Sequence, residues 1–182
     1  MILIARGFLI EYGQKMIKTS QHIIETVESL GIDTVYHEHD AVFTVEESKK
    51  IKNHIDGCGT KNLFLKNKKG VMVLVLAKHD TQVDLKGLSK RIGGGSLSFG
   101  KPDLLDEVLG VKPGSVTPLS LINDKDNRRI SYFVLDKAIT KYDYMNCHPM
   151  VNTATVVLKV SDLLKFIDHC GHEKLTLDLS NP

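Results

Sequence analysis

The residues best suited to chemistry fall in three polar segments. Lys61 and Asn62 stand at the start of an apolar run, after a turn that contains two glycines. The segment 114–118, Gly-Ser-Val-Thr-Pro, offers backbone amides and two hydroxyls, which can donate hydrogen bonds to a developing oxyanion. His148 and Asn152 precede a run of β-branched residues. Each segment feeds a strand or follows a helix, and we therefore predict that the three converge on one pocket.

Other chemical motifs are weaker. His37 and His39 alternate on a predicted strand and so share one side of it, but no third and fourth metal ligand follow at a familiar spacing. The pair Cys147-His148 lacks an orienting partner, and neighbouring residues rarely reach the geometry of a nucleophile and its base. The glycines at 93–95 lack the lysine and hydroxyl of a phosphate-binding loop. We predict no metal site, no thiol nucleophile and no phosphate loop at these positions.

Composition bounds the class of protein. The chain has 182 residues, 42% hydrophobic and 25% charged, which suits one globular domain. Three cysteines are an odd, sparse set, typical of reduced thiols in a cytoplasmic protein. No apolar run is long enough to cross a membrane, and the start lacks the features of a secretory signal. A net charge of +2 neither announces nor excludes nucleic-acid binding, because a local basic patch can hide in a balanced total.

Helical and strand patterns alternate along the chain. Because a tight hairpin joins two of the strands, we predict an α/β fold with a central mixed sheet flanked by helices. His172 is predicted to be a surface residue beyond a helix end. Residues 1–15 are predicted to be an extension, and 16–180 a single domain. The predicted helices cover 20–30, 44–55, 84–92, 102–109 and 161–170; the predicted strands cover 33–39, 63–66, 71–77, 130–135, 153–160 and 174–179, with an irregular segment at 141–150.

Six motifs stand in an order that resembles a known family. They are His-Asp-Ala-Val-Phe-Thr-Val-Glu-Glu at 39–47, Gly-Thr-Lys-Asn-Leu-Phe-Leu at 59–65, Leu-Ser-Phe at 97–99, Gly-Val-Lys-Pro-Gly-Ser-Val-Thr-Pro at 110–118, Asn-Asp at 123–124, and His-Pro at 148–149 with Asn-Thr-Ala-Thr at 152–155. Together they resemble the YbaK/ProX family of aminoacyl-tRNA deacylases, and within it the free-standing prolyl-tRNA editing type specific for alanine. The resemblance covers residues 16–180.

The resemblance implies a partly barrel-like sheet and hydrolysis of mischarged proline tRNA at its terminal adenosine. It implies that Lys61 and His148 are the catalytic residues, and that no cofactor or metal takes part. The expected partners are the acceptor end of tRNA(Pro) and prolyl-tRNA synthetase. The substrate-binding residues that it implies are Asn62, Gly114, Ser115, Val116, Thr117, Pro118, Asn152 and Thr44.

Alternatives stay open at this point. The same chemistry could act on Cys-tRNA(Pro), or on serine or threonine esters, because pocket volume decides the choice. A catalytically silent module that binds a tRNA end or a synthetase is a rival of another class. A nucleotide-binding regulatory domain is a third, although its usual glycine fingerprint is missing. Lys66, Lys68 and Lys69 form either a local phosphate-binding patch or a solvated turn.

Overall fold

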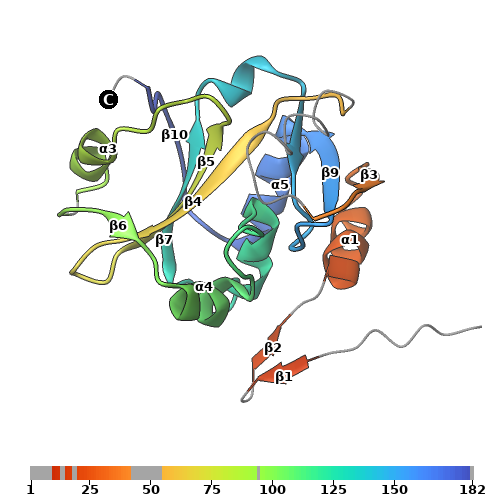
Figure 1. Cartoon of the computed structure of the whole chain (residues 1–182), viewed down its shortest axis with the longest axis horizontal. Coiled ribbons are helices and arrows are strands. Elements are labelled where there is room, and N and C mark those ends of the chain that lie inside the picture. Colours follow the sequence, from red (N-terminus) through yellow and green to blue (C-terminus); the bar gives the residue numbers. More distant parts are fainter. Residues whose placement is uncertain (1–9, 13–14, 18–19, 42–54, 94, 181–182) are drawn as a thin grey trace, which may run out of the picture.

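The computed structural model places two β-sheets around a central group of helices (Figure 1). It describes residues 10–12, 15–17, 20–41, 55–93 and 95–180. Thr44 and nearly all of the helix predicted over 44–55 lie outside these ranges. Within the described ranges, every helix is too short or too polar to span a lipid bilayer.

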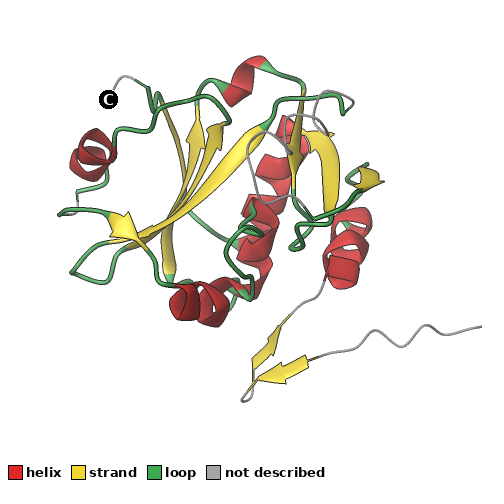
Figure 2. Ribbon diagram, viewed as in Figure 1, coloured by secondary structure: helices red, strands yellow, loops and turns green. Residues whose placement is uncertain are grey.

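The elements alternate along the chain much as the sequence pattern predicts (Figure 2). The helices are α1 (Ser20–Ser29), α3 (Leu85–Arg91), α4 (Pro102–Leu109) and α5 (Val160–Cys170), with 3-10 turns η1 (Pro118–Asn123) and η2 (Ile139–Lys141). The strands are β1 (Ile10–Tyr12), β2 (Lys15–Ile17), β3 (Val35–Glu38), β4 (Thr60–Lys66), β5 (Met72–Lys78), β6 (Ser98–Phe99), β7 (Ile130–Asp136), β8 (Tyr144–Cys147), β9 (Ala154–Lys159) and β10 (Lys174–Leu177).

The larger sheet is mixed, with strand order β10-β7-β5-β4-β6. The predicted hairpin is confirmed, because β4 and β5 pair antiparallel in register from Thr60↔Lys78 to Lys66↔Met72. Strand β7 then runs parallel to β5, and β10 runs parallel to β7. The mixed α/β class is therefore confirmed.

The smaller sheet has the order β3-β9-β8 and is antiparallel throughout. In the described part of the chain, it meets the larger sheet at one parallel bridge, between Cys58 and Met145. Closure into a partly barrel-like sheet, which the family resemblance implied, is not found among the described residues. The ribbon of β1 and β2 forms a separate pair and spans the position where the extension was predicted to end. The domain limits stay a prediction.

Apolar side chains form two cores on opposite faces of the larger sheet. The large core packs α1, α4, η1 and α5 between the two sheets, around residues such as Phe133 and Phe166. The small core packs α3 against the other face of β5, where Val73 and Val75 meet Leu88. Strand β5 is thus buried on both faces, which explains its unbroken apolar sequence.

Helix ends follow the local signals in the sequence. The side chain of Asp84 accepts a hydrogen bond from the amide of Lys86 and so caps α3. Pro102 opens α4, and Gly110 ends it in the left-handed conformation. The segment 141–150 was wrongly predicted to be irregular, because it contains β8. Its polar sequence carries no strand signal, and its pairing partners lie elsewhere in the chain.

The prediction that His172 lies on the surface is wrong. Its side chain is 1% exposed, and its Nε2 lies 3.8 Å from Oδ2 of Asp124, which is itself fully buried. Burial lowers the pKa of His172, the carboxylate of Asp124 opposes this shift, and the nearby Arg128 adds to it. His172 is therefore neutral near pH 7, and its contact with Asp124 is not an ion pair.

This burial predicts a pH dependence of stability. The unfolded chain takes up a proton at His172 below about pH 6.5, while the folded chain resists it, so stability falls as pH drops below that value. The slope is at most about 1.4 kcal/mol per pH unit for one site. Denaturant unfolding of the wild type and of His172→Leu from pH 7.5 to 5 measures it. We expect the free energy of unfolding to fall less steeply with decreasing pH in the variant than in the wild type. Equal slopes for the two proteins would contradict this account.

Candidate active site at the junction of the two sheets

Two neighbouring segments join the sheets along a short seam, which we define as the contacts of residues 57–60 with residues 144–146. The amide of Cys58 donates to the carbonyl of Tyr144 at 2.8 Å, and the amide of Asn146 donates to the carbonyl of Cys58 at 3.0 Å. The hydroxyl of Thr60 donates to the carbonyl of Asn146 at 2.6 Å. The seam fixes the start of β4 beside the end of β8.

Gly57 is needed for this approach. Its φ is +103°, a conformation that favours glycine, and a Cβ there would lie 2.7 Å from Oδ1 of Asn146. The glycine-rich turn before Lys61 thus lets the chain pass close to β8. The neighbours at this turn are the backbone of residues 144 and 145 and the side chain of Asn146.

Lys61 and Asn62 occupy consecutive positions of β4, so their side chains lie on opposite faces of the sheet. Asn62 shares its face with Phe64, a member of the large core. Lys61 shares the other face with Leu63, and it has no ion-pair partner among the described residues. The residue is half-buried, and its ammonium group carries a charge that no described carboxylate neutralises.

The same alternation orders the side chains of β8. Met145 and Cys147 belong to the large core, so Asn146 lies on the face turned away from that core. The next alternate position is His148, directly after the strand. Strand periodicity therefore places Asn146 on the face of β8 that is turned away from the large core, and His148 follows just beyond the end of the strand.

The predicted site did not include Asn146, although it has the mark of a binding residue. It is 3% exposed, and its Oδ1 is buried without a hydrogen-bond partner in the described chain. Such orphaned polar atoms cost folding energy and often mark functional positions. Oδ1 of Asn62 is in the same condition. Asn146 was missed because it lies in a segment that carried no strand signal.

His148 has a defined hydrogen bond through one ring nitrogen. Its Nδ1 lies 3.0 Å from the carbonyl oxygen of Ala154, and since a carbonyl only accepts, Nδ1 carries the proton. In the neutral ring Nε2 then holds the lone pair, as a general base requires. Asn152 is half-buried in the turn between His148 and β9.

The loop 114–118 approaches β8 from the side of the large core. Gly114 is exposed and has a φ of +90°, while Thr117 is fully buried and its hydroxyl accepts from the amide of Leu119. The side chain of Thr117 also hydrogen bonds Cys147. Within the described part of the chain, the amides of Val116 and Thr117 donate no hydrogen bond. The remaining candidates in this loop, Ser115 and Pro118, are buried.

The structure thus shows contacts between residues that belong to or adjoin the three predicted segments. Thr60 links the first segment to Asn146, and Thr117 links the second to Cys147, the residue before His148. It does not put them on one face, because Thr117 lies on the core side and Lys61 on the other. The catalytic and binding roles of Lys61, His148 and the loop 114–118 stay predictions.

The weaker motifs have structural roles. Both ring nitrogens of His39 are engaged, Nδ1 with the carbonyl of Asp40 at 2.8 Å and Nε2 with Oγ1 of Thr155 at 3.0 Å. No cluster of three or more metal-ligating side chains occurs among the residues that the structure describes. Burial raises the pKa of Cys147 to about 12, against a smaller opposing effect of its hydrogen bond with Thr117. A thiol in that state is a poor nucleophile.

Comparison with known proteins defines the class. The model of the aminoacyl-tRNA editing domain family matches residues 39–166. A zebrafish (Danio rerio) prolyl-tRNA synthetase associated domain-containing protein 1 is 41% identical over 155 residues, 84% of this chain and 83% of the relative. The prolyl-tRNA editing protein ProX of Acetoanaerobium sticklandii is 36% identical over 160 residues, 87% of this chain and 96% of the relative.

A solved structure shares the fold. The crystal structure of a candidate trans-editing enzyme for prolyl tRNA synthetase has a TM-score of 0.65 at 21% identity, covering 86% of this chain and 92% of that one. The chain belongs to the aminoacyl-tRNA editing domain family, the YbaK/ProX deacylases that its six motifs resemble. It is an editing hydrolase of that family, and its substrate is an aminoacyl-tRNA.

The state of the thiols gives a second testable prediction. Burial raises the pKa of Cys58 to about 11 and that of Cys147 to about 12. At pH 8 about one molecule in a thousand, or fewer, then carries either thiolate, and both should react slowly with Ellman's reagent. In urea all three cysteines should react at the rate of a free thiol. Rapid labelling of Cys147 in the folded protein would reopen a nucleophilic role for it.

Proposed function

We propose that this protein hydrolyses the ester of mischarged proline tRNA, with alanine as the preferred aminoacyl group. The observation that carries the proposal is that residues of or beside the three motif segments meet, Thr60 with Asn146 at the seam and Thr117 with Cys147 next to it. The names of the relatives support the link to prolyl-tRNA. We propose a single editing domain over residues 16–180, acting in the cytoplasm on the acceptor end of tRNA(Pro), with prolyl-tRNA synthetase as a further partner.

The need for such an enzyme follows from the energetics of selection. A pocket built for proline cannot strongly reject the smaller alanine, because one or two missing methylene groups change binding by only ~1–3 kcal/mol. A second site that admits alanine and excludes proline by size removes the error. The loop 114–118 is the natural wall of that site. It is short, it begins at the exposed Gly114, and its remaining residues are buried or half-buried.

Lys61 supplies the charge that holds the substrate. Lys61 is only half-buried and its ammonium group has no ion-pair partner among the described residues, so it can bind the terminal phosphate or the ribose of the RNA. Asn62, Asn152 and Thr44 are the further binding residues that the family resemblance assigns. Asn146 joins them on the strength of its unpaired Oδ1.

His148 handles the attacking water. With the proton on Nδ1, its Nε2 can accept a hydrogen bond from that water, either as general base or to orient it. The substrate's own 2′-hydroxyl can assist the same water. The ester carbonyl then becomes an oxyanion, and the amides of Val116 and Thr117 are donors available to stabilise it. Collapse expels the ribose oxygen, which takes up a proton, and releases the free amino acid.

A panel of charged tRNAs tests the proposal. Wild-type protein should release alanine from Ala-tRNA(Pro) and leave Pro-tRNA(Pro) intact; cysteine, serine and threonine esters test the alternative substrates. Lys61→Ala should lose at least about a hundredfold in kcat/KM, as expected when a positioning charge is removed, and Lys159→Ala, an exposed lysine on β9, serves as the matched control. Absence of hydrolysis with every ester would leave a tRNA-binding module, and unchanged turnover by Lys61→Ala would refute its role.

His148 can be tested by separating its two functions. His148→Asn keeps a donor that can reach the carbonyl of Ala154 but has no basic nitrogen, whereas His148→Ala removes both. If Nε2 acts on the water, both variants should lower kcat on the order of a hundredfold with little change in KM. Full activity of His148→Asn would show that the ring only holds the turn before β9. A rise in KM alone would make His148 a binding residue.

A further inference from the structure

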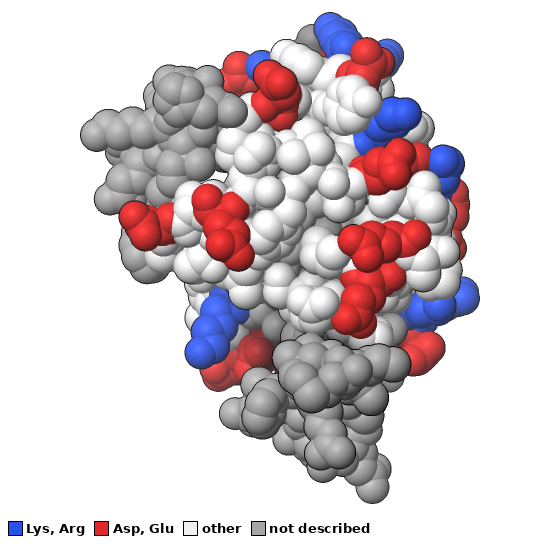
Figure 3. Space-filling view, turned by 90° about the vertical axis from the view of Figure 1, so that its right-hand side faces the viewer, with Lys and Arg blue, Asp and Glu red and all other residues white. Residues whose placement is uncertain are grey.

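Charge is strongly segregated along this chain. Residues 61–101 carry nine basic and two acidic side chains, a net charge of +7, although the whole chain stands at only +2. Residues 20–41 show the opposite imbalance, with five acidic side chains and no lysine or arginine. Figure 3 shows that, among the charged side chains on the face of the molecule with α1 and β3, Asp and Glu are more prominent than Lys and Arg. The near-neutral total therefore conceals two oppositely charged ends.

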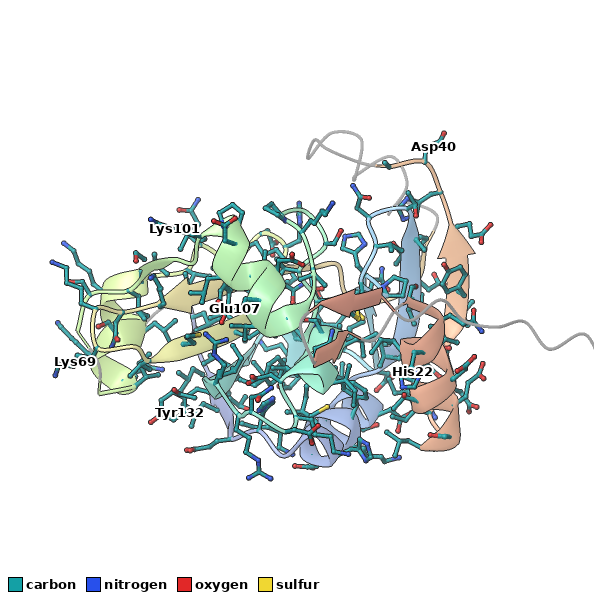
Figure 4. The ribbon with its side chains drawn as sticks, turned by 90° about the horizontal axis from the view of Figure 1, so that it is seen from below. His22, Asp40, Lys69, Lys101, Glu107 and Tyr132 are labelled. Atoms are coloured by element: carbon teal, nitrogen blue, oxygen red, sulfur yellow. The ribbon has the colours of Figure 1, made fainter. Side chains whose placement is uncertain are left out.

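The basic side chains gather at one end of the larger sheet. Figure 4 shows Lys69 and Lys101 at that end, with His22 and Asp40 at the opposite one. The turn of the β4–β5 hairpin, strand β6 and helix α3 all lie there (Figure 1). We call this the basic surface, and its residues are Lys66, Lys68, Lys69, Lys86, Lys90, Lys101 and Phe99.

None of these six lysines has an ion-pair partner among the described residues. By contrast, Lys78 pairs with Asp80 at 2.7 Å and Arg129 with Glu107 at 2.6 Å. Five of the six are exposed and Lys66 is half-buried. A group of unmatched cations raises the local potential and attracts a polyanion.

An aromatic side chain stands among these lysines. Phe99 lies on the two-residue edge strand β6 and is 63% exposed, which makes it the most exposed of the large hydrophobic residues that the structure describes. It pairs with Leu65, beside the pair of Lys66 and Ser98. Exposed aromatic rings between cations are a means by which proteins stack on nucleic-acid bases, at ~1–3 kcal/mol per base.

A hollow in the surface adjoins this strand. Between α3 and the segment before β6 lies an open cavity of about 670 Å³, lined in part by Lys86, Ser89, Lys90 and Leu97. Lys86 and Lys90 are four residues apart and therefore project from one side of α3. The hollow is lined by two lysines, whose ammonium groups can donate hydrogen bonds to phosphate oxygens, while the hydroxyl of Ser89 already donates to the carbonyl of Gly95.

Strand β4 connects this surface to the candidate active site. Its first residue, Thr60, makes the seam, and its last, Lys66, belongs to the basic surface. A strand rises about 3.3 Å per residue, so these two points are about 20 Å apart. An RNA strand whose end is bound at Lys61 would therefore reach the basic surface only with nucleotides well beyond the terminal one.

We propose that the basic surface binds the phosphodiester backbone of the RNA beyond its terminal nucleotide, with Phe99 stacked on a base or ribose. This proposal rests on the proposed function for the identity of the RNA. It adds a second contact region, remote from the ester, that gives affinity without selecting the aminoacyl group. Phosphate contacts position a nucleic acid and make its binding sensitive to salt.

Binding of uncharged proline tRNA tests the proposal without requiring hydrolysis. The triple variant Lys68→Gln, Lys69→Gln, Lys90→Gln should weaken binding on the order of tenfold, and its dependence of log K on log salt should become shallower by about one for each lysine–phosphate pair removed. A control triple, Lys137→Gln, Lys141→Gln, Lys159→Gln, removes the same charge from exposed positions elsewhere and should bind like wild type. Phe99→Ala should also weaken binding about tenfold, with Tyr36→Ala on β3 as its control.

An activity measurement separates the two proposals. For the basic-surface triple, the ratio of kcat/KM on full-length charged tRNA to that on an aminoacyl ester of a CCA trinucleotide should fall relative to wild type. Equal losses in both triples would mean that net charge alone acts and would overturn the proposal, as would an unchanged salt slope. Tighter binding to vesicles containing anionic lipid than to tRNA would overturn it in favour of a membrane. Failure of the wild type to hydrolyse any ester would refute the proposed function and leave the binding result standing.

Discussion

Three hydrogen bonds between residues 57–60 and 144–146 hold the two sheets of this protein together at the point where its function is proposed. The two segments that they join are only three or four residues long, but they lie more than eighty residues apart in the sequence. Each sheet has its own ladder of backbone bonds, and the large core fills the space between them. The seam fixes how the start of β4 stands relative to the end of β8. Lys61, Asn146 and His148 take their relative positions from it.

A second dependence runs through the loop 114–118. The loop is held at its far end by η1, whose last residue, Asn123, donates from its side chain to the carbonyl of Leu109 at 2.9 Å. Asp124 follows, and its Oδ2 accepts from the amide of Ile130 at 2.7 Å. The Asn-Asp motif at 123–124 therefore anchors the loop to α4 and β7. This gives a structural reason for a motif that offers no reactive group to a substrate.

Local signals in the sequence predicted most elements correctly. The hairpin, the Asp84 cap and the ends of α4 at Pro102 and Gly110 depend on neighbouring residues, and such signals can be read directly. Strand β8 could not be predicted in this way, since Tyr144–Cys147 is stabilised by pairing with β9 and by the seam. His172 was wrongly predicted to be exposed for the same reason, because residues distant in sequence, such as Asp124, bury its side chain. The same difference between local and long-range information applies to the site. The sequence motifs identified Lys61, His148 and the loop 114–118. Asn146 was identified only from the structure, which shows β8 and the buried, unpaired Oδ1 of this residue.

The seam also bears on how an enzyme of this fold could change its substrate. A pocket walled by one rigid sheet would need new side chains to change its volume. Here the predicted site lies where two sheets meet, in the described part of the chain, at a single bridge, and both residues of that bridge belong to the large core. Replacing a buried residue such as Met145 should change how the two sheets pack against each other while leaving the predicted substrate-binding residues chemically the same. Under the proposed function, size selectivity would therefore depend on how the two sheets pack together as much as on the residues that line the site.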